Sequence, residues 1–231
     1  MDSFKIGTIN NIGHFFHENL FYAIDSFLKN KNIKWILHSK LTEWELKFTL
    51  LCAKHLDIPC EFSDLTNHRS GLDYDIKKND NFYIIMDMIQ DIVNLEYPNT
   101  GFNKNYKVLY FRNDAQRRKM IGYENNLDLY FDEIIYDFNS MSFEKQVQLF
   151  MKCSHFVTIE GAHLTNIIFM NKDAKVLDIS PCENSWQLMF GTSYCVNTFE
   201  SFILGFGIDN FNDNIYYSST IENRIKMFLA F

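Results

Sequence analysis

Residues Cys153 to Pro181, CSHFVTIEGAHLTNIIFMNKDAKVLDISP, carry the pattern that decides the fold. Apolar and β-branched residues fill Phe156 to Ile159, which predicts a short buried strand. The pair Gly161-Ala162 then predicts a turn, His163 to Met170 a short helix, and Val176 to Ile179 the next strand. The stretch is therefore expected to form a β-turn-α-β unit.

The start of the predicted helix is a candidate anion site. The first backbone N–H groups of a helix have no partner within it, and the helix dipole favours negative charge there. Two interpretations of the Gly161-Ala162 turn stay open at this point. It binds a phosphate, or its small residues let a helix pack closely on a strand.

Composition is that of a globular protein with a substantial core. The 231 residues include 23 Phe, 9 Gly and 3 Pro, which argues against long linkers or disorder. The net charge of −7 disfavours a protein that binds nucleic acid. Five widely spaced cysteines fit neither a disulfide framework nor a zinc site, so reduced thiols are expected.

Neither a secretory signal nor a membrane span is expected. The N-terminal stretch MDSFKIGTINNIGHFF lacks a basic region followed by an apolar core. No window holds about 18 consecutive apolar residues, the length that a membrane helix needs. We therefore expect a cytoplasmic location, and the oligomeric state stays open.

Strand and helix patterns alternate along the rest of the chain. Helices are expected at Phe16–Leu28, Glu43–His55 and Ile221–Leu229, and further strands at Trp35–Leu37, Cys60–Phe62, Phe82–Met86, Val108–Phe111 and Glu133–Tyr136. Alternating strands and helices predict an α/β fold whose parallel sheets are covered by helices.

A domain boundary is expected within Tyr97 to Asn105, which contains Pro, Gly and Asn. It separates an N-terminal α/β domain of residues 1–100 from a second α/β domain of residues 101–200. The tail, residues 201–231, is expected to pack back on the first domain. In open α/β sheets ligands bind at the carboxyl ends of the strands, and both Arg112 and Gly161 directly follow predicted strands.

Two polar clusters are candidate functional groups. The densest cluster of positive charge contains Arg112, Arg117, Arg118 and Lys119. It fits either a solvated helix face or a phosphate-binding site, because a guanidinium group can bind two phosphate oxygens at once. On a helix, His14 shares a face with His17 and Glu18. These residues could belong to a zinc site, but such a site needs a third protein ligand that the sequence does not identify. They could instead form the polar first turn of a buried helix.

Four segments resemble, in the same order, the motifs of glycosyltransferase family 61. They are Gly13–Leu20 (GHFFHENL), Tyr110–Met120 (YFRNDAQRRKM), Ser142–Phe150 (SFEKQVQLF) and Gly161–Pro181. Two positions depart from the family's usual wording, which has His where this chain has Glu160 and Glu where it has Asp178.

The resemblance implies a compact GT-B-like fold of two Rossmann-like domains. It also implies an inverting glycosyltransferase that moves a sugar from a nucleotide diphosphate, such as UDP-xylose or UDP-GlcNAc, to a glycan hydroxyl. The donor-binding residues implied are Arg112, Arg118, Glu160, Gly161, Ala162, His163, Leu164, Thr165 and Asn166, with Asp178 on the ribose hydroxyls. Glu18 is the implied general base that deprotonates the acceptor, oriented by His14 or His17.

Alternatives to catalysis stay open at this point. The short chain and the departure at Glu160 also suit a non-catalytic nucleotide-sugar-binding module. A second alternative is a glycan-binding or structural α/β protein that has kept the fold and lost the donor. Asp73-Tyr74-Asp75 has the Asp-x-Asp form that other glycosyltransferases use for a divalent metal, but it lies in a polar loop outside the matched motifs. We therefore expect neither a metal nor another cofactor.

Overall fold

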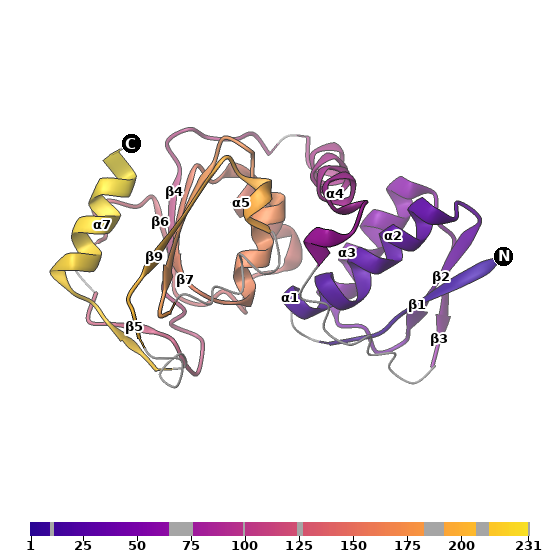
Figure 1. Cartoon of the computed structure of the whole chain (residues 1–231), viewed down its shortest axis with the longest axis horizontal. Helices are drawn as coiled ribbons and strands as arrows, with labels where there is room; N and C mark the ends of the chain where they lie inside the picture. Colours follow the sequence, from indigo (N-terminus) through magenta and orange to yellow (C-terminus); the bar gives the residue numbers. More distant parts are fainter. Residues whose placement is uncertain are drawn as a thin grey trace. The chain divides into compact units, whose positions relative to one another are not determined.

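In a computed structural model of the chain, the structure describes residues 1–9, 12–64, 76–98, 100–123, 127–182, 192–206 and 213–230. The chain divides into two compact units, and each is built on its own parallel sheet (Figure 1). Unit 1 is made mainly of Met1–Pro98 and the short segment Ala162–Ile168. Unit 2 is made of Asn99–Gly161 and most of the chain from Phe169 onward. The predicted α/β class with parallel sheets is confirmed.

Unit 1 contains a three-stranded parallel sheet in the order β1-β2-β3. Its elements are β1 (Asp2–Ile6), α1 (Ile12–Phe15), the π-helix η1 (Phe16–Leu20), α2 (Phe21–Lys29), β2 (Ile33–His38), α3 (Glu43–Leu56), β3 (Cys60–Ser63), the 3₁₀ helix η2 (Ile76–Lys78) and α4 (Phe82–Glu96). Along β2, Ile33, Trp35 and Leu37 are buried while the residues between them are half-buried, which is the period of two of a strand with one covered face.

The segment Phe82 to Met86, expected to be a strand, is the start of helix α4. Tyr83 and Ile84 are exposed, and the buried residues recur at helical spacing at Phe82, Ile85, Met86, Ile89 and Val93. The prediction was wrong because a short apolar run fits a buried strand and a helix equally well. The continuation of the buried stripe to Val93 decides between them.

Glu45 ties the start of α3 to the loop that follows β1. Its carboxylate is fully buried and accepts hydrogen bonds from the Thr8 hydroxyl and from the Ile9 N–H, each at 2.7 Å. It also accepts from the backbone N–H and the hydroxyl of Thr42, each at 2.8 Å, which completes a capping box. One carboxylate therefore positions the backbone at Thr8 and Ile9, just after β1.

Replacing Glu45 with alanine is expected to lower the free energy of unfolding by on the order of 3 kcal/mol, because several donors lose a charge-assisted bond. Urea denaturation followed by circular dichroism measures this change. Glu43→Ala is the matched control: Glu43 lies in the same turn, is 80% exposed and pairs with Lys47, so about 0.5 kcal/mol or less is expected. Equal stability of the two variants would contradict the role given to Glu45.

Unit 2 contains a five-stranded parallel sheet in the order β6-β4-β7-β8-β9 and a separate two-stranded one, β10-β5. Its elements are β4 (Lys107–Tyr110), β5 (Met120–Ile121), β6 (Glu133–Ile135), α5 (Phe143–Lys152), β7 (His155–Ile159), β8 (Lys175–Ser180), the 3₁₀ helix η4 (Thr192–Cys195), β9 (Thr198–Ile203), β10 (Ile215–Tyr216) and α7 (Ser219–Ala230). Between β7 and β8 runs the 3₁₀ helix η3 (Ala162–Phe169).

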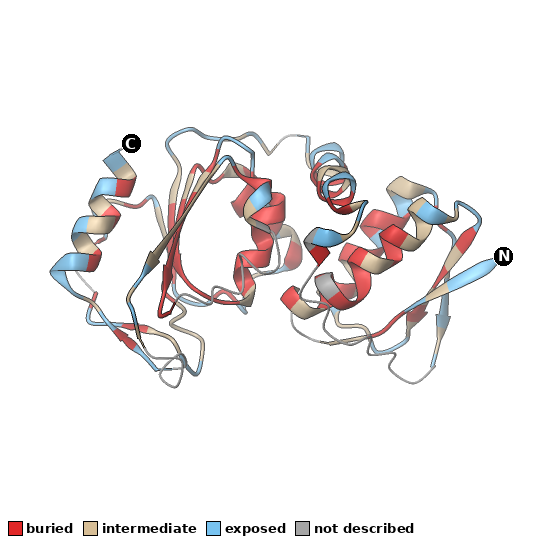
Figure 2. Ribbon diagram, viewed as in Figure 1, coloured by how far each residue is buried: buried red, intermediate tan, exposed pale blue. Residues whose placement is uncertain are grey.

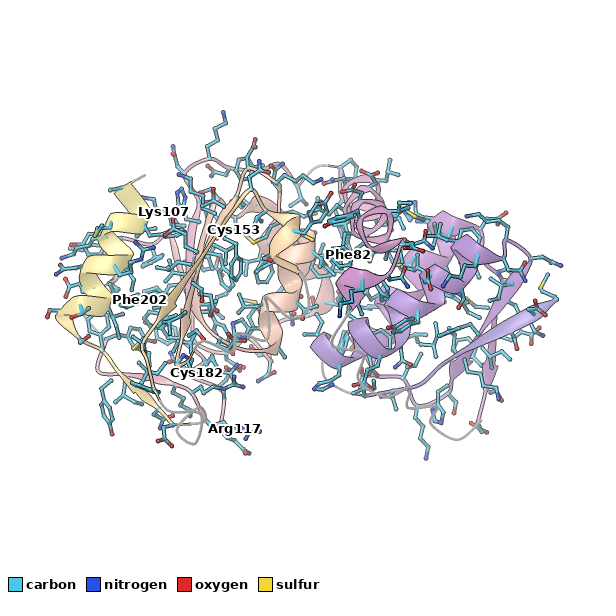
Figure 3. All side chains as sticks on the ribbon, in the orientation of Figure 1. Phe82, Lys107, Arg117, Cys153, Cys182 and Phe202 are labelled. Carbon is cyan, nitrogen blue, oxygen red and sulfur yellow. The ribbon has the colours of Figure 1, made fainter. Side chains whose placement is uncertain are left out.

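The strand order of the larger sheet reverses between β4 and β7. Numbered in their own order along the chain, the five strands stand as 2-1-3-4-5, so the chain first grows the sheet from β4 toward β6 and then returns to the other side. Lys107 and Cys153 lie toward the amino ends of these strands, and Arg117 and Cys182 toward the carboxyl ends (Figure 3).

Helices cover both faces of this sheet, so the middle strands are buried on both sides (Figure 2). On one face, Val157 belongs to the same core cluster as Ile225 and Phe228 of α7. On the other face, Phe156 packs edge-on against Phe150 of α5, with ring centroids 5.0 Å apart. Parallel sheets are usually covered in this way.

The C-terminal tail packs on unit 2, which corrects the expectation that it returns to the first domain. Ile221, Ile225 and Phe228 lie on one face of α7 at helical spacing and are buried in the core of unit 2. The physical reason is the open face of the parallel sheet, which needs an apolar helix to cover it. No helix in the described part of the chain has the length and apolar character to span a membrane.

Candidate functional site

The carboxyl ends of β4 and β7 form the switch point of the sheet in unit 2. Open α/β sheets bind ligands at such a point, because the connections after the two strands diverge and leave a crevice. The loop after β4 carries Arg112 and Arg118, and β7 is followed directly by Glu160 and Gly161. Both motifs that the sequence singled out after strands therefore lie at the same edge of one sheet.

Arg112 and Arg118 lie in a loop with a strained backbone. Met120 N–H donates to the Phe111 carbonyl oxygen at 3.2 Å and closes the loop. The φ angle is 60° at Arg112 and 57° at Arg118, a left-handed region that residues with a Cβ seldom adopt. Each such residue costs about 1 kcal/mol or more, and such residues cluster at functional sites. The fixed conformation of these two residues therefore lowers the folding stability of the loop.

Asp114 anchors this loop. It accepts a hydrogen bond from the Tyr110 hydroxyl at 2.5 Å and from the backbone N–H groups of Phe138 at 2.9 Å and Asn139 at 3.0 Å. The loop after β4 is thereby joined to the segment after β6. Asp114 lies inside the motif quoted above, but its anchoring role follows only from the partners that the fold brings to it.

The two arginines are partly buried, like-charged neighbours. Nη1 of Arg112 donates to the Glu160 carbonyl oxygen at 3.2 Å, and its buried Nε has no hydrogen-bond partner among the described residues. Burial lowers the pKa of Arg112. Burial, and then the charge of Arg112, lower the pKa of Arg118 to about 10. An anion bound beside the pair would offset this penalty on the charged forms.

Two carboxylates act on the arginines. Glu160 and Asp178 are fully buried, and the charge of each raises the pKa of Arg118 against the effect of burial. The Ser180 hydroxyl lies 3.4 Å from Glu160 Oε2 and has a closer acceptor, the Cys182 carbonyl oxygen at 2.8 Å. The burial of Asp178 inside β8 favours a role as counter-charge to Arg118 over the ribose contact that the resemblance implies.

The segment after β7 is the 3₁₀ helix η3, where an α-helix was expected. Every residue from His163 to Met170 is buried. Thr165 and Asn166 are fully buried, and the Thr165 hydroxyl and Asn166 Oδ1 have no hydrogen-bond partner within the described residues. Nδ2 of Asn166 donates to the His163 carbonyl oxygen at 3.0 Å.

In unit 1, the chain after β1 brings His14 and Glu18 together. Nδ1 of His14 lies 2.7 Å from Oε1 of Glu18, the i,i+4 contact of one helix face. Glu18 belongs to the π-helix η1, in which Phe21 N–H donates to the Phe16 carbonyl oxygen; such turns are rare and recur at functional sites. The Glu18 side chain is 1% exposed and that of His14 is 31% exposed, so solvent reaches the imidazole more readily than the carboxylate.

Some candidate residues lie outside the described part of the chain. These are the side chain of His17 and the whole of Asp73-Tyr74-Asp75. Among the residues that the structure describes, no three His, Cys, Asp or Glu side chains are grouped so that they could hold a metal ion.

Comparison with known proteins gives a family for the chain. The family model described as Glycosyltransferase 61 matches residues 12–177, well over half of the sequence. The match includes the His14–Glu18 pair, the arginine loop and the Gly161 turn, and ends one residue before Asp178. No curated protein matches the chain. With its strand-following motifs gathered at one sheet edge and this family match, the chain belongs to glycosyltransferase family 61.

Proposed function

We propose that the protein transfers a sugar from a nucleotide diphosphate to a glycan hydroxyl with inversion at the anomeric carbon. Family membership supports glycosyl transfer in general. The observation that carries the donor class is the pair Arg112 and Arg118, held in strained conformations at the switch point of a parallel sheet. Two such cations suit a diphosphate leaving group, on which negative charge grows during transfer. Two Rossmann-like units suit the GT-B arrangement, and the family resemblance favours UDP.

In the proposed donor complex, Arg112 and Arg118 bind the diphosphate oxygens. The negative charge of the donor then offsets the burial and the neighbouring charge of Arg112, which together lower the pKa of Arg118. Gly161 brings no side-chain bulk beside Arg112, whose Nη1 contacts the carbonyl oxygen of the preceding residue.

We assign to His14 the role of general base, which takes the proton from the hydroxyl of the glycan acceptor. The exposure of His14 and the burial of Glu18 support exchanging the roles that the family resemblance implied, a base at Glu18 and an orienting imidazole at His14. As the acceptor oxygen bonds to the anomeric carbon and the bond to the diphosphate breaks, Nε2 of His14 takes the acceptor proton. Glu18 accepts a hydrogen bond from Nδ1–H of His14, which holds Nε2 as the proton acceptor and stabilises the imidazolium that forms.

The direct test uses purified protein with UDP-GlcNAc, UDP-xylose and a panel of glycan acceptors. Release of UDP that depends on the acceptor supports transfer, and NMR of the product shows whether the anomeric configuration is inverted. Binding of UDP without turnover on any acceptor would favour the non-catalytic nucleotide-sugar-binding module. Absence of UDP binding would contradict the donor site.

Transfer is expected to continue in the presence of EDTA, because Arg112 and Arg118 are proposed to neutralise the diphosphate. The measurement compares initial rates in EDTA with rates after addition of Mn²⁺. Asp73→Asn and Asp75→Asn are expected to retain activity. Loss of turnover in EDTA with recovery in Mn²⁺ would contradict metal-independent transfer and direct attention to these two aspartates.

A further inference from the structure

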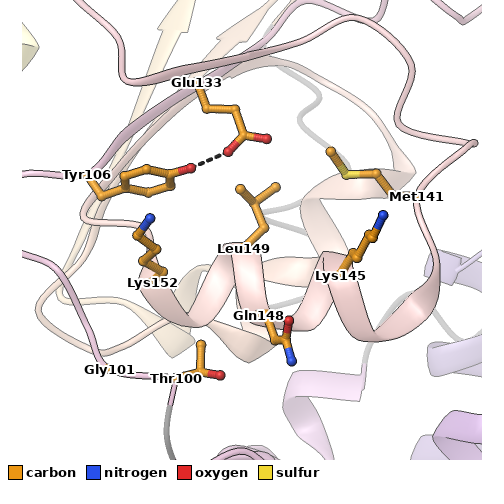
Figure 4. A pocket seen from close by; sticks show the side chains of 9 residues that line it. All are labelled: Thr100, Gly101, Tyr106, Glu133, Met141, Lys145, Gln148, Leu149 and Lys152. Carbon is orange, nitrogen blue, oxygen red and sulfur yellow. Dashed lines mark hydrogen bonds between the residues drawn. The ribbon is translucent and has the colours of Figure 1, made fainter.

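Unit 2 contains a pocket that shares no residue with the arginine loop (Figure 4). Its volume is about 520 Å³, inside the range of roughly 300–1,000 Å³ of small-molecule sites. Helix α5 lines it with Lys145, Gln148, Leu149 and Lys152, whose spacing puts them on one helix face. Tyr106 and Glu133 line it from the amino ends of β4 and β6.

The two lysines stand at opposite ends of this pocket (Figure 4). They are two helical turns apart, about 10 Å along the axis of α5. Nζ of Lys152 lies 3.6 Å from the centroid of the Tyr106 ring, a cation–π contact that occupies one face of that ring. Lys145 is exposed at the other end. The pocket thus offers one cation already engaged with a ring and one that faces solvent.

The opposite wall provides hydrogen-bonding groups. The Tyr106 hydroxyl donates to the Glu133 carboxylate, and burial together with this bond raises the pKa of Tyr106. Glu133 retains further acceptor capacity, and the Gln148 amide provides both donors and an acceptor. Two lysines against one glutamate leave the pocket positive within a chain of net charge −7.

These groups favour a ligand that carries both an anionic group and hydroxyl groups. The lysine ammonium is a compact charge with three donors, suited to a carboxylate or a phosphate. Glu133 repels a polyanion but accepts hydrogen bonds from sugar hydroxyls. A nucleotide base would stack on an aromatic face, and Lys152 already occupies one face of Tyr106, the aromatic residue among the described residues that line the pocket.

We propose that this pocket binds an acidic saccharide, a sugar that bears a carboxylate or a phosphate. Lys145 binds the anionic group, the sugar ring lies over Leu149, and Gln148 and Glu133 bind its hydroxyls. Lys152 contributes positive charge from its place on the Tyr106 ring. The site is separate from the proposed donor site and does not depend on it.

The first experiment titrates the full ¹⁵N-labelled chain with glucuronate, glucose 6-phosphate, glucose and inorganic phosphate. Glucuronate and glucose 6-phosphate are expected to bind saturably and more weakly as salt rises, while neutral glucose and phosphate alone bind far less well. A response to only one of the two acidic sugars identifies carboxylate or phosphate as the anion recognised. Saturating UDP should leave the binding of glucuronate unchanged.

The second experiment changes the pocket. Lys145→Gln is expected to weaken glucuronate binding roughly tenfold or more, the loss of one charge-assisted contact. Lys47→Gln removes the same charge from α3 in unit 1 and should leave affinity unchanged. Displacement by UDP, equal binding of glucose, equal binding of phosphate alone, no saturable binding, or wild-type affinity in Lys145→Gln would each overturn the proposal.

Discussion

Turnover is expected to fall by about 10²–10⁴-fold in His14→Gln, while UDP affinity stays unchanged. Glutamine keeps a hydrogen-bonding group near Glu18 but cannot accept the acceptor's proton. Glu18→Gln should lose a similar factor, because the amide no longer holds the imidazole tautomer or stabilises the imidazolium. Initial rates of UDP release with acceptor, together with calorimetric titration of UDP, separate the loss of chemistry from any loss of binding.

His55→Gln provides the control for these two variants. His55 lies in the same unit, and its Nε2 is 3.1 Å from a carboxylate oxygen of Glu96, so it also belongs to a histidine–carboxylate pair. Its replacement should leave turnover unchanged. If Glu18→Gln abolishes turnover while His14→Gln retains it, the carboxylate is the base. Near wild-type rates in both variants would remove the pair from catalysis.

UDP affinity is expected to fall roughly ten- to a hundredfold when Arg112 or Arg118 is replaced by alanine, because each loses a charge-assisted phosphate contact. Arg118→Lys should recover only part of the loss, since an ammonium cannot grip two oxygens as a guanidinium fork does. Isothermal titration calorimetry of UDP measures the three variants.

Arg117→Ala is the matched control for the arginine variants. Arg117 carries the same charge in the same loop but is exposed, and its φ angle is not in the left-handed region. Its loss should change UDP affinity little. Wild-type affinity in both Arg112→Ala and Arg118→Ala, with the fold intact, would make these arginines part of the loop surface and contradict the donor site.

Local patterning was sufficient to predict most of the central elements. The apolar runs Phe156–Ile159 and Val176–Ile179 form β7 and β8, because short β-branched runs bounded by turns have few alternatives. The strands β1 and β9 were missed; both are edge strands whose residues are mostly exposed or half-buried, so their apolar pattern is weak. The run Phe82–Met86 was misassigned because the burial that distinguishes helix from strand extends beyond it.

The sequence by itself determined the fold class, the family and the residues at the ends of strands, because these depend on neighbours along the chain. Only the tertiary structure decided that β4 lies beside β7, which brings the Arg112 loop to Glu160 across 48 positions of sequence. It also decided that α7 covers unit 2. The folded structure also buries Asp178 and leaves His14 more accessible than Glu18, and these differences support the roles that we propose for them. Whether solvent reaches a side chain depends on residues that are distant in sequence, so it cannot be predicted from a local motif.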